Sequence, residues 1–359
     1  LIQHSSFNIP HSTFLIQHSS FNISFPVGHS LTWFLREDRA SNEQTSYKNR
    51  LHPRKFGLEF IPMKTPSSPL ANSYFSGAGL MDIGLRRGGI EIQQSFEIDP
   101  ICCATQRLNF THAVVECDIR QKLVALEKPC DVMIATYPCK KYSPIADIHG
   151  TRTGEDLFLH FFRHIAIRQP EAYVVENVPG MRRFPVVMEA MTALPDYFVN
   201  VFCPVSSQTW LPQRRDRLII LGSRKRFKWR EPNCNRRISL AEIIESDPRV
   251  EIPKYVAKRI GGAYRDRPII SDPAGGDIAP TCVAHYAKDL STRLVVDRRF
   301  PHGLRPYSVR EYARLQGVPD SFTFAGSDRD AYRMIGNGVS VPVGEWIGKE
   351  LKRYFGTRR

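Results

Sequence analysis

Short apolar runs alternate with amphipathic stretches along the chain from Ser73 onward. In the amphipathic stretches apolar residues recur every third or fourth position, as Leu157, Phe161 and Ile165 do. Strands that alternate with helices in this way form a parallel sheet, so the pattern predicts an α/β fold. We expect strands over residues 73–77, 94–99, 113–119, 131–138, 172–178 and 217–223.

Three helix starts are marked by capping residues. Asp99 can cap a helix that begins at Pro100. Proline is tolerated at this first position because the N–H group that it lacks would have no acceptor within the helix. The spacings Thr153-x-x-Asp156 and Ser308-x-x-Glu311 predict two further starts, the second as a capping box. These signals support helices between the predicted strands.

Both ends of this α/β pattern meet segments of different character. The segment "LIQHSSFNI" occurs at 1–9 and again at 15–23, an offset that fits neither a helix nor a strand, so we expect residues 1–70 to be a poorly ordered extension. Between about 224 and 304 the rhythm breaks into short basic pieces with Pro and Gly, which predicts a second, smaller domain.

Charge narrows the class of partner. The 359 residues include 50 Lys or Arg against 36 Asp or Glu, a net charge of +14, which is typical of a protein that binds a polyanion such as nucleic acid, but also of a soluble protein that is simply basic. Residues 224–310 hold 19 Lys or Arg against 10 Asp or Glu, and include "SRKRFKWR". Such a stretch is typical of a phosphate-facing surface, with Phe227 and Trp229 stacking or in the core, but also of an ordinary solvated face.

Cysteine usage and hydropathy exclude several classes. The eight cysteines show no C-x-x-C pair and no spacing typical of zinc, so we expect no metal site and a reducing, intracellular, cytoplasmic location. Adjacent Cys102 and Cys103 are expected on a helix as small core residues. The sequence has no apolar run of membrane-spanning length and no signal peptide.

A glycine-containing loop follows the first predicted strand. Gly77 and Gly79 allow a tight turn and a close ligand, whereas a dinucleotide fingerprint needs a third glycine where Asp82 stands. Glu97 ends the next strand, where a carboxylate can bind ribose hydroxyls, and Asp118 ends the third, where another can meet an adenine amino group. A nucleoside cofactor without a pyrophosphate, such as S-adenosylmethionine, fits this set. A purely structural turn is the alternative.

Polar residues also mark the ends of the later strands. Cys139 follows an apolar run and Pro138, and is either a spare thiol or a nucleophile. Glu176 ends the strand "AYVVENV", where burial would raise its pKa, unless it merely caps or supports a neighbour. Arg215 and Arg217 alternate on one strand face, either as a clamp for an acceptor oxygen or as a surface charge ladder. Together these residues predict a methyl-transfer site at the carboxyl ends of the strands.

Six motifs occur in the order found in the DNA (cytosine-5) methyltransferases, which the chain closely resembles. They are "FSGAGLMDIG", "PCKKYS", "ENV", "QRRDR", "RPYSVREYARLQGVPDSF" and "IGNGVSVPV". The resemblance implies a doubly wound, mostly parallel, Rossmann-like methyltransferase sheet over 71–223 and 305–359. It also implies a small basic target-recognition domain over 224–304.

By this resemblance Cys139 is the nucleophile that adds to carbon 6 of cytosine, and Glu176 acts at ring nitrogen 3. Arg217, with Arg215 beside it, would meet the exocyclic oxygen of the ring. The positions that match the family's S-adenosylmethionine site are Phe75, Gly77, Gly79, Glu97, Asp118, Pro138, Asn337 and Val339.

The resemblance further implies double-stranded DNA as substrate, a flipped target base, a short recognition site and a monomer, with a cognate restriction endonuclease as a partner. Lys140 stands where the family usually has Gln, and "ATYPC" replaces a glycine-containing approach. Methylation of transfer RNA is the alternative, although the tripeptide Cys-Phe-Thr of that branch is absent. An inactive DNA-binding homologue and a nicotinamide oxidoreductase are further alternatives. The retained Cys139 and Glu176 argue against both.

Overall fold

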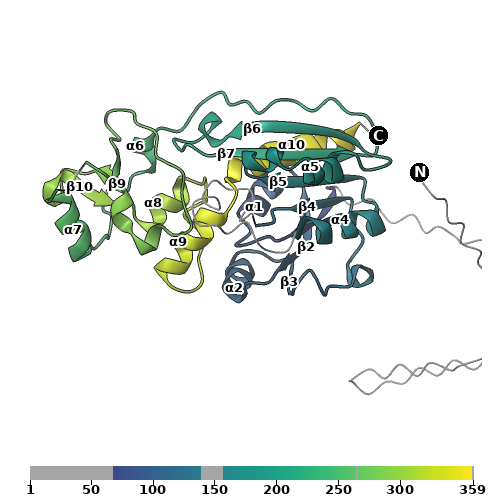
Figure 1. Cartoon of the computed structure of the whole chain (residues 1–359), viewed down its shortest axis with the longest axis horizontal. Helices are drawn as coiled ribbons and strands as arrows, with labels where there is room; N and C mark the ends of the chain where they lie inside the picture. Colours follow the sequence, from purple (N-terminus) through teal and green to yellow (C-terminus); the bar gives the residue numbers. More distant parts are fainter. Residues whose placement is uncertain (1–67, 139–156, 264–265, 358–359) are drawn as a thin grey trace, which may run out of the picture. The chain divides into compact units, whose positions relative to one another are not determined.

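A seven-stranded sheet forms the centre of the larger part of the molecule (Figure 1). The structure is a computed structural model that describes residues 68–138, 157–263 and 266–357. All of them belong to one compact unit, Pro62–Arg359. Of the predicted N-terminal extension, residues 1–67 lie outside the described residues. The strands are β1 Leu70–Tyr74, β2 Glu91–Glu97, β3 Ala113–Glu116, β4 Val132–Ala135, β5 Ala172–Asn177, β6 Phe198–Ser206 and β7 Asp216–Ser223.

The strand order is β3-β2-β1-β4-β5-β7-β6. The pairs among β1 to β5 are parallel, while β7 pairs antiparallel with both β5 and β6. The predicted mostly parallel, doubly wound sheet is therefore confirmed. The first and third predicted strands are shifted or shortened, because β1 ends before Phe75, whose φ of 56° breaks the extended backbone, and β3 ends at Glu116.

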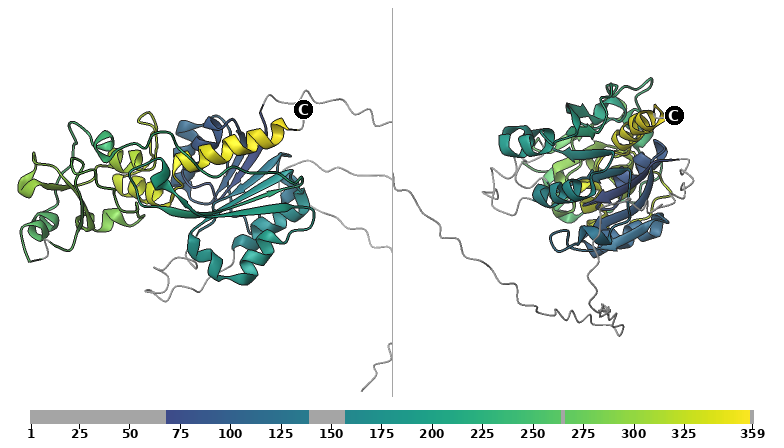
Figure 2. Two further views of the ribbon diagram at one scale, coloured as in Figure 1. Left: turned by 90° about the horizontal axis from the view of Figure 1, so that it is seen from above. Right: turned by 90° about the vertical axis from the view of Figure 1, so that its right-hand side faces the viewer.

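Alternate residues of the strands enter two separate cores. On β5, Ala172 and Val174 pack on one face with helices α1 and α10, whereas Tyr173 and Val175 pack on the other with α4 and α5. Figure 2 shows α10 on one side of the sheet and the α4–α5 pair on the other. These helices, with α2, are α1 Leu80–Arg87, α2 Pro100–Asn109, α4 Leu157–Arg168, α5 Pro185–Thr192 and α10 Val341–Gly356.

Two of the predicted helix starts are present. Asp99 accepts hydrogen bonds from the N–H groups of Ile101 and Cys102, and Pro100 is the first residue of α2. Ser308 forms the capping box at the start of α8. Cys102 and Cys103 are buried on α2, as expected. Thr153 and Asp156 lie outside the described residues.

Helices α1 and α10 cross at their glycines, although they are separated by most of the chain. A Cβ atom at Gly84 would lie 2.1 Å from the carbonyl oxygen of Val341, and one at Gly348 would lie 2.7 Å from that of Leu85. Gly88 and Gly344 meet backbone atoms in the same way. The crossing therefore brings helix backbones into direct contact, which leaves no room for a side chain at these four positions.

The remaining elements form a smaller part with a three-stranded sheet of order β10-β9-β8. Buried Tyr286, Tyr312 and Tyr332 lie in a core that also includes Leu80 of α1. The elements are α6 Leu240–Ile243, α7 Lys254–Ile260, β8 Ile269–Ser271, β9 Arg293–Val296, β10 Leu304–Pro306, α8 Val309–Arg314 and α9 Asp328–Asn337. Short 3-10 turns complete the fold at η1 Val124–Leu126, η2 Pro179–Arg183, η3 Ser207–Thr209, η4 Tyr286–Lys288, η5 Leu290–Thr292 and η6 Pro301–Gly303.

Candidate active site

The sheet has its switch point between β1 and β4. From β1 the chain winds outward through β2 and β3, and from β4 it winds the other way through β5. Ligands of open α/β sheets bind outside the carboxyl ends of the strands at such a point, where two loops diverge. The loops that flank it here are 75–79 after β1 and the segment that begins at Thr136 after β4.

The loop after β1 is shaped by its glycines. Gly77 has φ +55° and a Cβ atom there would meet nothing within 4 Å, so its backbone faces open space. Gly79 has φ +79° and a Cβ atom there would lie 2.5 Å from the ring of Phe110, so this position requires glycine on both counts. The N–H group of Gly77 donates to Glu97 Oε2 at 2.7 Å, which joins the loop to the end of β2.

Carboxylates stand at or just beyond the ends of the next two strands. Glu97 also accepts the N–H groups of Ile98 and Asp99 at 2.9 Å each, so its carboxylate has a fixed direction beside Gly77. Asp118 lies in the loop two residues after β3, not at its end as predicted. Hydrogen bonds from Arg120 lower the pKa of Asp118 to about 2, so it is an ionised acceptor.

The chain that leads to Cys139 is held from both sides. The hydroxyl of Thr136 donates to the carbonyl oxygen of Phe75 at 2.8 Å. The N–H group of Thr136 donates to the carbonyl oxygen of Tyr74 at 3.2 Å. On the other side, Asn177 Nδ2 donates to the carbonyl oxygen of Tyr137 at 3.1 Å. The backbone is thus fixed up to exposed Pro138, between the loop after β1 and the end of β5. Cys139 itself, with Lys140 and Ser143, lies outside the described residues.

Glu176 and Arg217 form an ion pair beside this approach. Arg217 Nε lies 2.7 Å from Glu176 Oε1, with the two side chains only 13% and 8% exposed. Burial raises the pKa of Glu176, in the predicted direction, while Arg217 and then Arg215 oppose the shift. The arrangement offers a buried carboxyl group that can share a proton, with a guanidinium oriented next to it.

Arg215 contacts different partners from those predicted. It precedes β7, and its Nη1 donates to the carbonyl oxygen of Cys282 at 2.8 Å, while Nη2 donates to those of Gly336 at 2.9 Å and Gly338 at 2.6 Å. Burial lowers the pKa of Arg215 to about 9, which leaves it charged at neutral pH. Its side chain is therefore committed to joining three backbone segments, not to a clamp with Arg217.

The C-terminal motif lies against the start of α1. A Cβ atom at Gly338 would be 2.4 Å from Leu80, the first residue of that helix. Asn337 is exposed at the end of α9, whereas the side chain of Val339 is 3% exposed and packs in the core. The side chain of Val339 faces the core because α10 begins two residues later, and the assignment of this position to the cofactor site stays a prediction.

The match to known proteins covers nearly all of this sheet and its loops. The model of the family described as C-5 cytosine-specific DNA methylase matches residues 72–272 and 279–353. The chain belongs to this family. The methylase is 28% identical over 328 residues to the Type II methyltransferase M.Eco47II of Escherichia coli, covering 77% of each chain. It is 28% identical to M.NgoPII of Neisseria gonorrhoeae, covering 78% of this chain and 94% of that one.

Solved structures support the fold of the methylase. The Entamoeba histolytica methyltransferase EhMeth superposes with a TM-score of 0.69 at 17% identity, covering 81% of this chain and 99% of that chain. A putative DNA modification methyltransferase encoded within an Escherichia coli prophage superposes with a TM-score of 0.62 at 20% identity, covering 80% and 100%. The recognition made on the six motifs is confirmed.

Methylases of this family use S-adenosylmethionine as methyl donor, and the loop after β1 fits that molecule. Gly77 leaves open space where a ligand can approach the backbone, Glu97 stands at the end of β2, and Asp118 stands in the loop after β3. Such acceptors suit ribose hydroxyls and an adenine amino group. Within the described residues no group of three His, Cys, Asp or Glu could hold a metal ion.

Several residues that position this site in the methylase had no marker in the sequence. Thr136 holds the approach to Cys139, and Gln106 donates to the carbonyl oxygen of Gly77 at 2.6 Å. Gln316 donates to the carbonyl oxygens of Ile335 at 2.8 Å and Gly338 at 3.2 Å, which ties the end of α9 to the segment after α8. Their partners are distant in sequence, so local patterns carry no trace of them.

Among the described helices, none has the length and apolarity needed to cross a membrane.

Proposed function

We propose that this methylase transfers a methyl group from S-adenosylmethionine to carbon 5 of cytosine in double-stranded DNA, at a short specific sequence. The observation that carries the proposal is the fixed approach to Cys139, which runs between the cofactor loop and the Glu176–Arg217 pair. A cytosine bound here would meet the buried Glu176 carboxyl group, and Cys139 is the next residue after the fixed backbone.

The chemistry follows from the residues at this point. The Cys139 thiolate adds to carbon 6, and the electron pair of the 5,6 double bond makes carbon 5 nucleophilic. Carbon 5 takes the methyl group that the sulfonium cofactor supplies. Carbon 5 then loses its proton to a base, the double bond re-forms, and the thiolate leaves. The atoms balance as one methyl group gained and one proton released.

Glu176 would lower the barrier to the first step. Burial raises its pKa, so it takes up a proton more readily than an exposed glutamate and can then hydrogen-bond ring nitrogen 3 as negative charge moves into the ring. Arg217, only 13% exposed, would meet the exocyclic oxygen on the same side of the base. Arg215 would act as a positioning residue that keeps the C-terminal motif against α1.

DNA is the favoured substrate because the chain is basic and its relatives are named Type II methyltransferases. The net charge of +14 suits a phosphate backbone, and the target base would leave the helix stack to reach the site. We propose catalytic parts at 71–223 and 305–359, and target recognition by residues 224–304, whose helices and strands begin after Ser239. A cognate restriction endonuclease and a monomeric state complete the proposal.

Transfer of a tritiated methyl group tests the reaction and its nucleophile. Wild type and Cys139→Ser would each be incubated with labelled S-adenosylmethionine and either mixed-sequence duplex DNA or transfer RNA. Label in DNA from wild type alone is expected, and sequencing of the product would identify the site. Label in RNA alone would overturn the DNA assignment. Cofactor binding by Cys139→Ser, measured by calorimetry, controls for folding.

A mixed-sequence duplex that contains 5-fluorocytosine tests the covalent step. Fluorine at carbon 5 cannot leave as a proton does, so the enzyme should remain bonded to the DNA after methyl transfer. We expect a complex that survives denaturing electrophoresis with wild type and is absent with Cys139→Ser. Labelled product without any stable complex would contradict the adduct at Cys139.

A further inference from the structure

The basic segment after β7 lies away from the candidate active site. Ser223 pairs with Ala172 at the start of β5, whereas Leu218 pairs with Asn177 at its end. Five residues of strand separate the two edges, which is about 17 Å. The cations that follow Ser223 therefore begin at the edge of the sheet opposite the cofactor loop.

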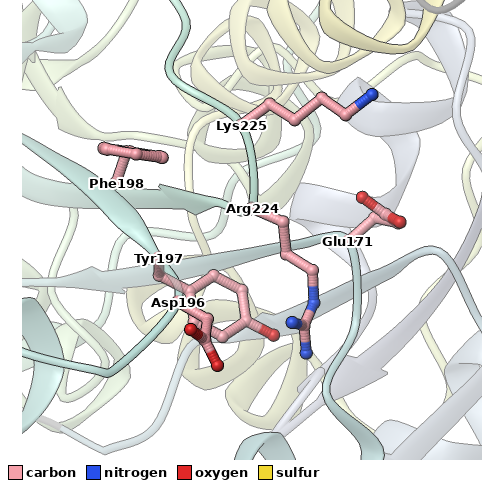
Figure 3. Close-up of a pocket in the computed structure, with 6 residues that line it drawn as sticks. All are labelled: Glu171, Asp196, Tyr197, Phe198, Arg224 and Lys225. Carbon is pink, nitrogen blue, oxygen red and sulfur yellow. The ribbon is translucent and has the colours of Figure 1, made fainter.

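A pocket of about 530 Å³ marks that opposite edge (Figure 3). Its lining residues are Glu171, Asp196, Tyr197, Phe198, Arg224 and Lys225. The guanidinium of Arg224 lies over the ring of Tyr197 at 5.1 Å, and it donates to the carbonyl oxygens of Gln169 and Pro170. Because this pocket holds two carboxylates and Arg224 is committed to backbone oxygens, an anion is not favoured inside it.

Beyond the pocket the chain has an alternating pattern. Phe227 and Trp229 turn inward and pack on Tyr354 of α10, at ring distances of 5.3 and 5.7 Å, so the core alternative holds for both. Arg226, Lys228 and Arg230 are exposed, and we call these three the cation row. Inward-facing aromatic residues thus alternate with exposed cations over residues 226–230.

Helix α10 holds the backbone of the cation row in place. The N–H group of Arg230 donates to Glu350 Oε2 at 2.8 Å, its carbonyl oxygen accepts from Trp346 Nε1 at 3.0 Å, and the carbonyl oxygen of Lys228 accepts from Arg353. These bonds use main-chain atoms of Lys228 and Arg230, which leaves their side chains exposed, whereas the guanidinium of Arg226 lies over the ring of Phe198 at 4.7 Å. Among the described residues, no carboxylate pairs with any of the three cations.

The row also has a direction. After Arg230 the segment runs back along β6 and α10 toward α6 (Figure 1), where Ile238 bonds to Trp210. Residues 224–237 hold seven Lys or Arg and one acid, Glu231. The charge thus forms a strip that leads from the far edge of the sheet toward the helices and strands of the proposed recognition part.

We propose that the cation row binds the sugar-phosphate backbone of DNA outside the target sequence. The proposal rests on DNA being the substrate. A row of exposed cations without carboxylate partners suits a polyanion, and backbone contacts of this kind carry no sequence information. The row would hold long DNA to the enzyme without touching the reacting base.

The test is the salt dependence of binding to long duplex DNA, measured with the full chain and without cofactor. Each phosphate contact adds about 0.9 to the slope of log affinity against log salt, so Lys228→Glu with Arg230→Glu should reduce the slope by about 2. Affinity near 0.1 M salt should fall on the order of tenfold. Labelling of a short duplex that contains only the target site should keep its kcat.

Two controls separate the row from net charge. Arg107→Glu with Lys128→Glu changes the net charge equally at exposed positions on α2 and before β4, and should leave most of the slope. Lys228→Arg with Arg230→Lys should bind as wild type does. The proposal would be overturned if both charge-reversed variants gave the same reduced slope, or if both kept the slope of wild type. The second of these results would favour an acidic protein as the occupant of the row. If the wild-type enzyme placed no label on the short duplex, the proposed function would be contradicted. The slopes for binding to long DNA would still test whether the cation row binds phosphates.

Discussion

The crossing of α1 and α10 leads to a prediction that can be worked out from distances. In Gly348→Ala the new methyl group would stand 2.7 Å from the carbonyl oxygen of Leu85 and 2.9 Å from Gly88 Cα. Ordinary contact begins near 3.4 Å, so the two helices must separate by about 0.7 Å. Neither obstacle is a side chain that could rotate away.

The change in the free energy of unfolding follows from the packing contacts that this separation weakens. A gap of 0.5–1 Å forfeits roughly a quarter to a half of the attraction between packed atoms. Five buried side chains of α10 face this core, among them Ile347 and Leu351, each worth about 2 kcal/mol. The loss is about 3 kcal/mol, against which Ala in a helix recovers about 1 kcal/mol. We expect a net destabilisation of about 2 kcal/mol.

Denaturant unfolding of Gly348→Ala, with Gly356→Ala as matched control, measures this difference. Gly356 is on the same helix, is exposed, and a Cβ atom there would meet nothing within 4 Å, so its substitution should be neutral or stabilising by about 0.5 kcal/mol. Because α1 starts at the cofactor loop, Gly348→Ala should also weaken binding of S-adenosylmethionine in calorimetry. A Gly348→Ala protein as stable as Gly356→Ala would show that the helices do not meet through their backbones.

Three further predictions concern single side chains. Arg215→Met removes three hydrogen bonds to carbonyl oxygens and should lower the free energy of unfolding by about 3–5 kcal/mol, as measured by thermal unfolding. Cofactor binding should also weaken. An unfolding temperature equal to that of wild type would contradict the role of Arg215 in joining the three backbone segments. Burial raises the pKa of Asp82 to about 7. The contribution of this carboxyl group to the free energy of unfolding is therefore complete below pH ~4 and is lost as the pH rises through 7, a loss of at most about 4 kcal/mol. Asp82→Asn should therefore stabilise the protein at pH 8.5 relative to wild type but much less at pH 5, and equal gains at both would refute this. Asn177→Ala frees the carbonyl oxygen of Tyr137 and should lower kcat about tenfold while cofactor affinity is kept, whereas a changed cofactor affinity alone would point to a different role.

Local patterns were sufficient for most elements of the sheet. The strand β5 was predicted within one residue because its whole length is buried and apolar up to Glu176. The starts of α2 and α8 depend on caps that lie within three residues of the helix they begin, so they are also local. Strand β6 was missed because it lies at the edge of the sheet, where half-exposed residues show no clear alternation.

The sequence by itself determined the family, six of the seven strands of the larger sheet, and the direction of the pKa shift of Glu176. These depend on short motifs and on burial that a continuous apolar strand implies. Only the tertiary structure decided that Arg215 binds the carbonyl oxygens of residues 282, 336 and 338, and that the cation row lies opposite the cofactor loop. Both outcomes depend on segments 50 to 130 residues apart that pack together, and the direction of a side chain is set by such contacts, which no local periodicity records.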